Sequence, residues 1–117
     1  MFRQDGPIVK KSIDFAVKII NYSDQLNQKR QFIFSDQFLK SGTSIGANVF
    51  EAQYAESRLD FIHKMKIALK EANETFYWLT LCKKMEDIIV GCEILDELNE
   101  IMALLSRIII TSKKNLN

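Results

Sequence analysis

The sequence predicts an all-α fold, an antiparallel up-down-up-down four-helix bundle that makes up a single domain over residues 1–117. Apolar residues recur every three or four positions in four segments, expected as helices over residues 7–26, 33–55, 58–86 and 92–114. One Pro and four Gly leave little of the turn-forming composition that an all-β fold needs. The breaks between the segments are short, and short connections favour antiparallel neighbours.

The first helix carries two apolar stripes. It is expected to begin with Asp5 or Gly6 as N-cap and Pro7 at the first helical position, where a missing N–H group costs nothing. One stripe comprises Val9, Ile13, Ala16, Ile20 and Ser23, and its neighbour comprises Phe15, Ile19, Tyr22 and Leu26. Together they form a face wider than one partner helix requires. The polar run 27–31 is expected to be the first loop.

Small residues fill the centre of the second helix. Gly42 and Gly46 each cost about 1 kcal/mol in a helix relative to Ala, so we expect another helix to approach the backbone closely there. The predicted inward face comprises Phe34, Phe38, Ile45, Val49 and Ala52. The helix-packing motif predicted around the two glycines comprises Ser41, Gly42, Ser44, Ile45, Gly46, Asn48 and Glu51. Its polar members form a stripe that is expected to be either solvated or hydrogen-bonded in a contact.

The third helix has more apolar surface than a monomer needs. Ser57-x-x-Asp60 resembles a capping box at its start. Its predicted core line comprises Phe61, Met65, Ala68, Ala72, Thr75, Leu79 and Cys82. Another line mixes large apolar groups with acids, and comprises Ile67, Glu71, Glu74, Trp78 and Leu81. Because a contiguous apolar patch is unusual on the surface of a monomer, we predict that this line contacts a second subunit.

Gly91 suits the turn before the fourth helix. The core line of that helix is expected to comprise Ile94, Leu98, Ile101, Leu105, Ile108 and Ser112. Leu104 and Ile110 make its later turns apolar on nearly all sides. The fourth helix therefore also carries apolar surface beyond what the core requires.

Composition points to a cytoplasmic protein. No apolar run approaches the roughly 18 residues that a membrane span needs, and the first residues lack the apolar region of a signal peptide. Cys82 and Cys92 are too few for a disulfide framework and are expected to be thiols. The 16 basic and 15 acidic residues give a net charge of +1, so no strong overall field attracts nucleic acid or anionic lipid.

No motif predicts an enzyme, a cofactor site or a metal site. Di-iron bundles use Glu-x-x-His pairs, whereas the one histidine, His63, falls on the polar face of the third helix. Ser41 and Ser44 have no histidine nearby in sequence to act as a base. Gly42-x-x-x-Gly46 lacks the Lys-Ser/Thr of a phosphate loop. Acids such as Glu51 are therefore expected to pair with basic groups or to accept hydrogen bonds.

The run from residue 37 to residue 81 carries three motifs: Gln37-Phe38-x-x-Ser41-Gly42-Thr43-Ser44-Ile45-Gly46-Ala47-Asn48-Val49-x-Glu51-Ala52, then Ser57-x-x-Asp60-Phe61-Ile62-x-Lys64, then Ile67-Ala68-Leu69-Lys70-Glu71-Ala72-Asn73-Glu74-Thr75-x-Tyr77-Trp78-Leu79. With these motifs the chain resembles the bacterial four-helix-bundle family known as 23S rRNA intervening sequence proteins. The resemblance implies a ring-like homopentamer without established enzymatic activity. A related group, the accessory variability proteins of diversity-generating retroelements, is thought to bind nucleic acid through a basic pentamer. The net charge of +1 departs from that pattern.

Two functions of different class follow. The first is a non-enzymatic homo-oligomeric adaptor, a scaffold for an unknown protein partner, which the surplus apolar lines favour. The alternative is an RNA- or DNA-binding accessory protein that acts through a local basic surface of the ring. Its candidate contacts are Lys10, Lys11, Lys18, Lys29, Arg30 and Lys40. The sequence leaves open whether Trp78 faces the core or a neighbouring subunit.

Overall fold

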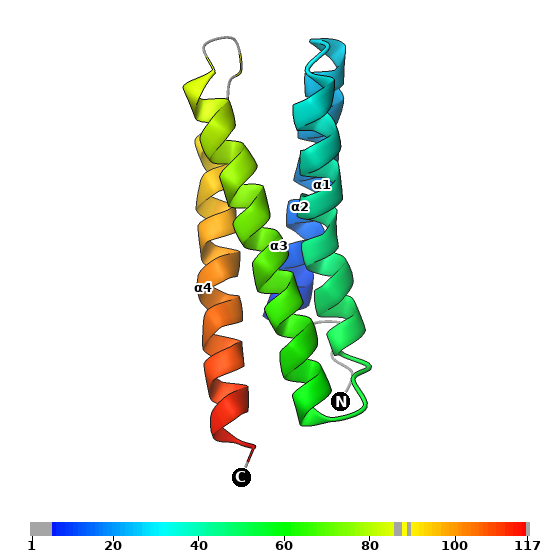
Figure 1. Ribbon diagram of the computed structural model, residues 1–117, viewed down its shortest axis with the longest axis vertical. Helices are drawn as coiled ribbons and strands as arrows, with labels where there is room; N and C mark the ends of the chain where they lie inside the picture. The colour runs from blue at the N-terminus through cyan, green and yellow to red at the C-terminus, as the bar shows by residue number, and fades with distance from the viewer. Residues whose placement is uncertain (1–5, 86–87, 89, 117) are drawn as a thin grey trace.

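The computed structural model describes residues 6–85, 88 and 90–116, without the side chain of Cys92, and consists of four long helices (Figure 1). They are α1 (Pro7–Gln28), α2 (Phe32–Ala52), α3 (Arg58–Lys84) and α4 (Cys92–Lys114). Each helix packs against two others, in the order α1, α2, α3, α4 around the bundle, and the contact between α1 and α4 is the least extensive. The molecule measures 51 × 21 × 20 Å. Among the helices described, none is both long and apolar enough to cross a membrane.

Pairs of residues across the helix contacts show that neighbouring helices are antiparallel. The Oγ1 of Thr75 in α3 donates to the Oγ of Ser41 in α2, while the later α2 residue Glu51 pairs with the earlier α3 residue Lys64. Between α1 and α4, Lys11 pairs with Glu100 and Lys18 with the earlier Glu97. The predicted four-helix bundle is therefore confirmed.

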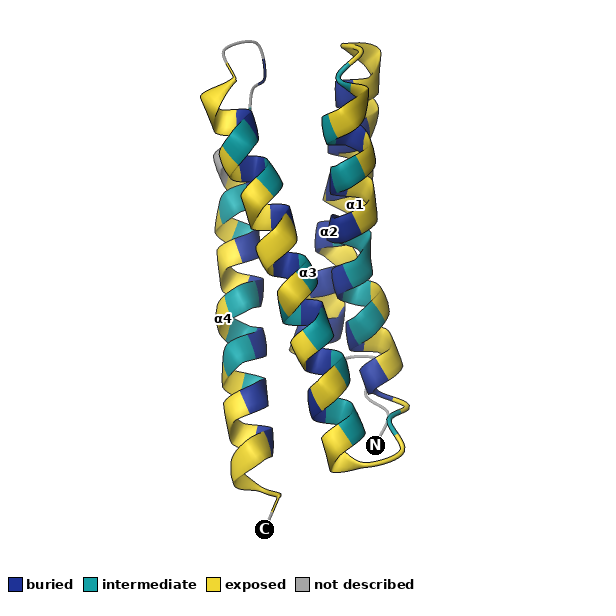
Figure 2. Cartoon of the chain, in the orientation of Figure 1, coloured by how far each residue is buried: buried dark blue, intermediate teal, exposed yellow. Residues whose placement is uncertain are grey.

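The core runs the length of the bundle, along the inner side of every helix (Figure 2). Its largest fully buried side chains include Phe15, Ile19, Phe38, Ile45, Met65, Leu79, Leu98, Ile101 and Leu105. Burial of one such side chain contributes roughly 1.5–3 kcal/mol, so this single cluster is the main source of stability. Each of these residues lies on an apolar stripe or core line predicted from helical spacing.

The two glycines of α2 let it approach α1 closely, as the sequence predicted. A Cβ added at Gly42 would lie 2.8 Å from the Cγ2 of Ile19, and one added at Gly46 would lie 3.3 Å from the backbone oxygen of Ser12. Real Cβ atoms essentially never come within 3.0 Å of such a neighbour. The close contact therefore offsets the helix propensity that the glycines lose.

The ends of α1, α2 and α3 differ from the predicted ones by two or three residues. α1 continues to Gln28 and is followed by Arg30 with a positive φ of 61°. α2 ends at Ala52 rather than residue 55, because the next backbone N–H groups bond three residues back, from Gln53 to Phe50 and from Tyr54 to Glu51. α3 ends at Lys84, two residues before the predicted end at 86, which lies outside the described residues.

The starts of α1, α3 and α4 agree with the predicted ones, and α2 begins at Phe32, one residue before its predicted start. Gly6 is the N-cap of α1 with Pro7 at its first position, and Gly91 is the N-cap of α4. The Oγ of Ser57 accepts a hydrogen bond of 3.0 Å from the N–H of Asp60 at the start of α3. The Asp60 carboxylate accepts from the N–H of Glu56, one residue before the cap, rather than from Ser57 as in a complete capping box.

Candidate interaction surfaces of the bundle

Two rows of side chains run next to each other along α2 and α3, and we call them the α2–α3 face. They comprise Ser44, Asn48 and Glu51 of α2 with Ile67, Glu71, Glu74, Trp78 and Leu81 of α3. Contacts between the helices fix this border: the Ser41–Thr75 hydrogen bond of 2.9 Å lies beneath it, and the Glu51–Lys64 ion pair of 3.5 Å lies towards one end. The outer polar members of the predicted packing motif thus share one surface with the predicted subunit contact, whereas Gly42 and Gly46 lie against α1.

The polar residues of α2 bond mostly within their own helix. The Ser44 hydroxyl donates to the backbone oxygen of Lys40 at 2.6 Å, and the Asn48 amide donates to that of Ser44 at 2.8 Å. Ser41 is buried and accepts a hydrogen bond from α3, whereas Ser44 and Asn48 are half-buried. Glu51 also reaches α3, through its ion pair with Lys64. Because the Ser44 hydroxyl and the Asn48 amide already donate hydrogen bonds within α2, a partner can cover this row without leaving these donors unpaired.

Trp78 lies at the edge of the core, between α2 and α3. Its ring meets Phe34 of α2 edge-on at 6.1 Å between centroids and Tyr77 at 5.3 Å. Its Nε1 is buried, with no hydrogen-bond acceptor among the described residues. A buried donor without an acceptor costs roughly 1–3 kcal/mol. Within one chain, Trp78 therefore packs against the core but leaves its polar atom unsatisfied.

The apolar members of the α2–α3 face, Trp78 included, are half-buried, and Glu71 is half-buried as well. They are not fully exposed because α2 packs beside them. Ile67 and Leu81 both keep part of their surface open on either side of Trp78. Glu74 is exposed, and neither it nor Glu71 forms an ion pair with another described residue. The face therefore combines an apolar line with two carboxylates.

A second apolar surface lies on the outer side of α1 and α2. Ile13, Val17 and Ile20 follow one another at helical spacing and are 46%, 53% and 49% exposed. Leu39 and Phe50, eleven residues apart on the neighbouring side of α2, are also exposed. We call these five residues the α1–α2 face. The predicted stripe that contains these isoleucines is buried only in part: Val9 is buried, whereas Ile13 and Ile20 are exposed because α2 and α4 cover the other stripe of α1.

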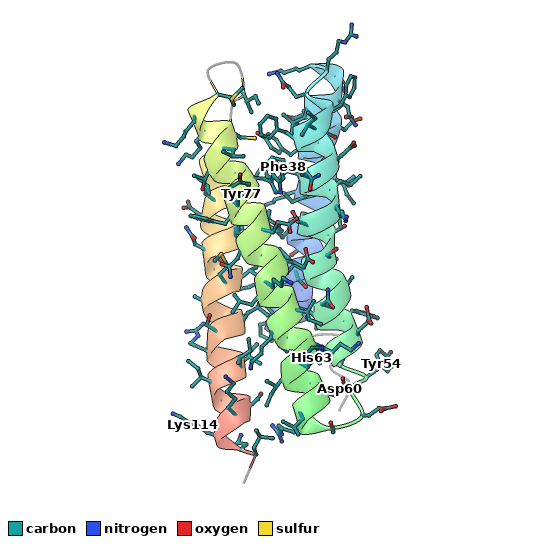
Figure 3. The ribbon with its side chains drawn as sticks, in the orientation of Figure 1. Phe38, Tyr54, Asp60, His63, Tyr77 and Lys114 are labelled. Atoms are coloured by element: carbon teal, nitrogen blue, oxygen red, sulfur yellow. The ribbon has the colours of Figure 1, made fainter. Side chains whose placement is uncertain are left out.

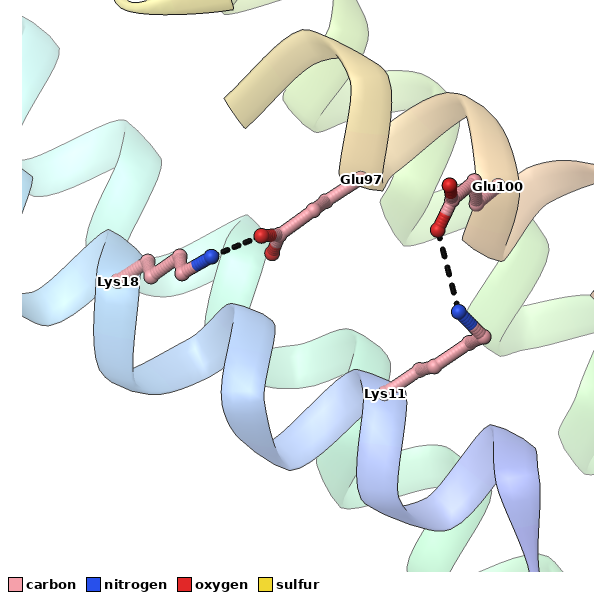
Figure 4. A network of polar contacts seen from close by, with 4 residues as sticks. All are labelled: Lys11, Lys18, Glu97 and Glu100. Atoms are coloured by element: carbon pink, nitrogen blue, oxygen red, sulfur yellow. Dashed lines mark hydrogen bonds and ion pairs between the residues drawn. The ribbon is translucent and has the colours of Figure 1, made fainter. Parts of the chain in front are cut away.

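The six candidate nucleic-acid contacts do not gather on one surface. Lys11 and Lys18 reach across to α4, where they pair with Glu100 and Glu97 (Figure 4). The Glu97 carboxylate raises the pKa of Lys18 above its ordinary value. The other four are exposed, Lys10 on α1, Lys29 and Arg30 in the loop after it, and Lys40 on α2. The basic groups are therefore divided between two sides of the bundle and one end.

Nucleophilic and metal-binding groups are not brought together in the part of the chain that the structure describes. Cys82 is buried in the core, as predicted, and burial raises the pKa of its thiol to about 11, so the reactive thiolate is rare at neutral pH. Burial, with a smaller contribution from Cys82, raises the pKa of Tyr22 to about 12. His63 is exposed on α3, away from Tyr77 at its other end (Figure 3). No cluster of metal-ligand residues occurs in the described ranges.

Comparison with known proteins agrees with this architecture. The model of the 23S rRNA-intervening sequence protein family matches residues 4–110. A crystal structure of a protein of unknown function from the S23 ribosomal protein family of Bacteroides thetaiotaomicron superposes with a TM-score of 0.80. It is 48% identical over 87% of this chain and 97% of that one. Among curated proteins, no relative matches.

Proposed function

The chain belongs to the family of 23S rRNA-intervening sequence proteins, and from that premise we propose that it is a non-enzymatic, cytoplasmic homo-oligomer that acts as a protein-interaction scaffold. Neither the family nor the similar structure carries a catalytic description. The observation that carries the proposal is Trp78, a large aromatic side chain that is half-buried with an unsatisfied Nε1 in an apolar line. A second copy would cover the part of this line that one chain leaves open.

The two apolar faces support a head-to-tail contact. In a ring, each subunit presents one surface to the subunit before it and a different surface to the subunit after it. The α2–α3 face and the α1–α2 face are two such surfaces on adjacent sides of one bundle. We therefore propose that the α2–α3 face of one subunit covers the α1–α2 face of the next. Five copies is the number that the family resemblance implies.

Trp78 provides the test, because it is the single tryptophan of the chain. Ile67→Glu places a charge in the α2–α3 face three turns from Trp78, about 16 Å away along the helix, too far to alter the ring directly. We expect acrylamide to quench Trp78 emission more strongly in Ile67→Glu than in the wild type, because a subunit that covered Trp78 has left.

The matched control is Ile110→Glu, which places the same charge at an exposed apolar position on α4. Quenching in this variant should equal that of the wild type. Equal quenching in all three proteins, with unchanged helical circular dichroism, would contradict a subunit contact at Trp78.

Nucleic-acid binding is the alternative function. Its support is the group of exposed Lys29, Arg30 and Lys40, which form no ion pair with other described residues. The pairing of Lys11 and Lys18 with acids of α4 weighs against it. Salt-dependent RNA binding by the wild type that is abolished in Lys29→Glu/Arg30→Glu would favour this alternative over the scaffold.

A further inference from the structure

A cavity of about 590 Å³ is lined by residues of the α2–α3 loop, the start of α3 and the last turns of α4. These segments all lie at the same end of the bundle (Figure 1). Its volume falls within the range of small-molecule sites, roughly 300–1,000 Å³. Phe61 of α3 and Ile108 of α4 form part of its apolar wall. None of the residues of the α2–α3 and α1–α2 faces lines it, so it is distinct from both proposed subunit contacts.

Two arginines from different helices line this cavity, Arg58 at the start of α3 and Arg107 on α4. Neither forms an ion pair with another described residue, whereas Lys11, Lys18 and Lys64 all do. Glu56 is the acidic residue on the wall, so the lining carries a net positive charge. A guanidinium offers paired N–H donors that match the oxygens of a phosphate group.

The first turn of α3 adds to this positive end. Ser57 caps the N–H of Asp60, and the preceding N–H groups of the first turn have no acceptor within a helix. The partial positive charge of a helix N-terminus favours an anion such as phosphate, and the Asp60 carboxylate in the same turn already balances part of it.

A serine hydroxyl is also available to a ligand. Ser112 of α4 lines the cavity, and its side chain makes no hydrogen bond with another described residue. Its hydroxyl group can therefore donate to a ligand oxygen.

We propose that this cavity binds a small soluble phosphate monoester. Arg58 and Arg107 contact the phosphate oxygens, Ser112 donates to the ligand, and the organic part lies against Phe61 and Ile108. This site does not depend on the oligomer, since its lining comes from one chain.

The test is calorimetric titration of the full chain with phenyl phosphate, with inorganic phosphate as a second probe. We expect phenyl phosphate to bind more tightly, because inorganic phosphate cannot use the apolar wall. Hydrogen bonds to a charged group contribute about 1.5–3 kcal/mol, so Arg58→Gln and Arg107→Gln should each weaken binding by about 10-fold or more. Glu56→Gln, which removes the acid, should strengthen it.

The control variant is Lys83→Gln, which removes an exposed positive charge at the other end of α3 and should bind like the wild type. No heat from phenyl phosphate at millimolar concentration, or equal affinities in the wild type and both arginine variants, would overturn the proposal. Binding to vesicles that contain phosphatidic acid without binding to phenyl phosphate would overturn the small-molecule assignment in favour of a lipid headgroup.

Discussion

Gly42→Val is expected to lower the free energy of unfolding by about 3 kcal/mol, the upper end of the usual range for overpacking a core. A Cβ at this position would lie 2.8 Å and 2.9 Å from the two γ carbons of Ile19. Ile19 has no exposed surface, so it cannot move aside without displacing its neighbours. Urea denaturation at one fixed protein concentration measures the change.

Ala47→Gly separates packing from helix propensity. Ala47 is exposed in the same helix, so its replacement should cost about 1 kcal/mol through propensity alone. Ile19→Ala should cost roughly 2–5 kcal/mol in the wild type and less in the Gly42→Val background, where the new side chain occupies part of the space. A Gly42→Val protein as stable as the wild type would contradict the close packing of α1 and α2.

A mixture of two monomeric variants is expected to form dimers. Ile67→Glu damages the α2–α3 face and Val17→Glu damages the α1–α2 face, so each variant alone should have the mass of one chain. If the contact is head-to-tail, each variant keeps the face that the other has lost. One intact junction can then form, and sedimentation of the mixture should show a species of twice the chain mass.

The control mixture combines Ile67→Glu with Ile110→Glu, whose added charge lies on α4 outside both faces. It should contain the full oligomer of Ile110→Glu, and Ile67→Glu should add at one end of any open assembly. A mixture of Ile67→Glu and Val17→Glu that remains monomeric would contradict the head-to-tail contact. If the Val17→Glu protein alone forms the oligomer, the α1–α2 face is not part of the subunit contact.

The bundle could be predicted because helical periodicity is a local signal. The spacing of residues such as Met65, Ala68 and Ala72 identifies an inward side of α3 without knowledge of its neighbours. The same reasoning found Gly42, whose cost in a helix implies a nearby backbone or side chain. These features depend on residues within a few turns of one another.

Features that depend on distant residues could not be predicted in the same way. The two stripes of α1 look alike in sequence, and only the positions of α2 and α4 decide that Ile19 is buried and Ile20 is exposed. Lys11 pairs with Glu100, which lies 89 residues away in the sequence, and Lys18 pairs with Glu97, which lies 79 residues away. The cavity that Arg58 shares with Arg107 likewise exists only once the ends of α3 and α4 meet.

The most direct test of the subunit contact is the solution mass of the wild-type protein, measured by light scattering after size exclusion at micromolar concentration. The account predicts a mass close to five times the 13.6 kDa of one chain. A mass of 13.6 kDa at every concentration would contradict it, and the apolar line through Trp78 would then be a surface for a different protein.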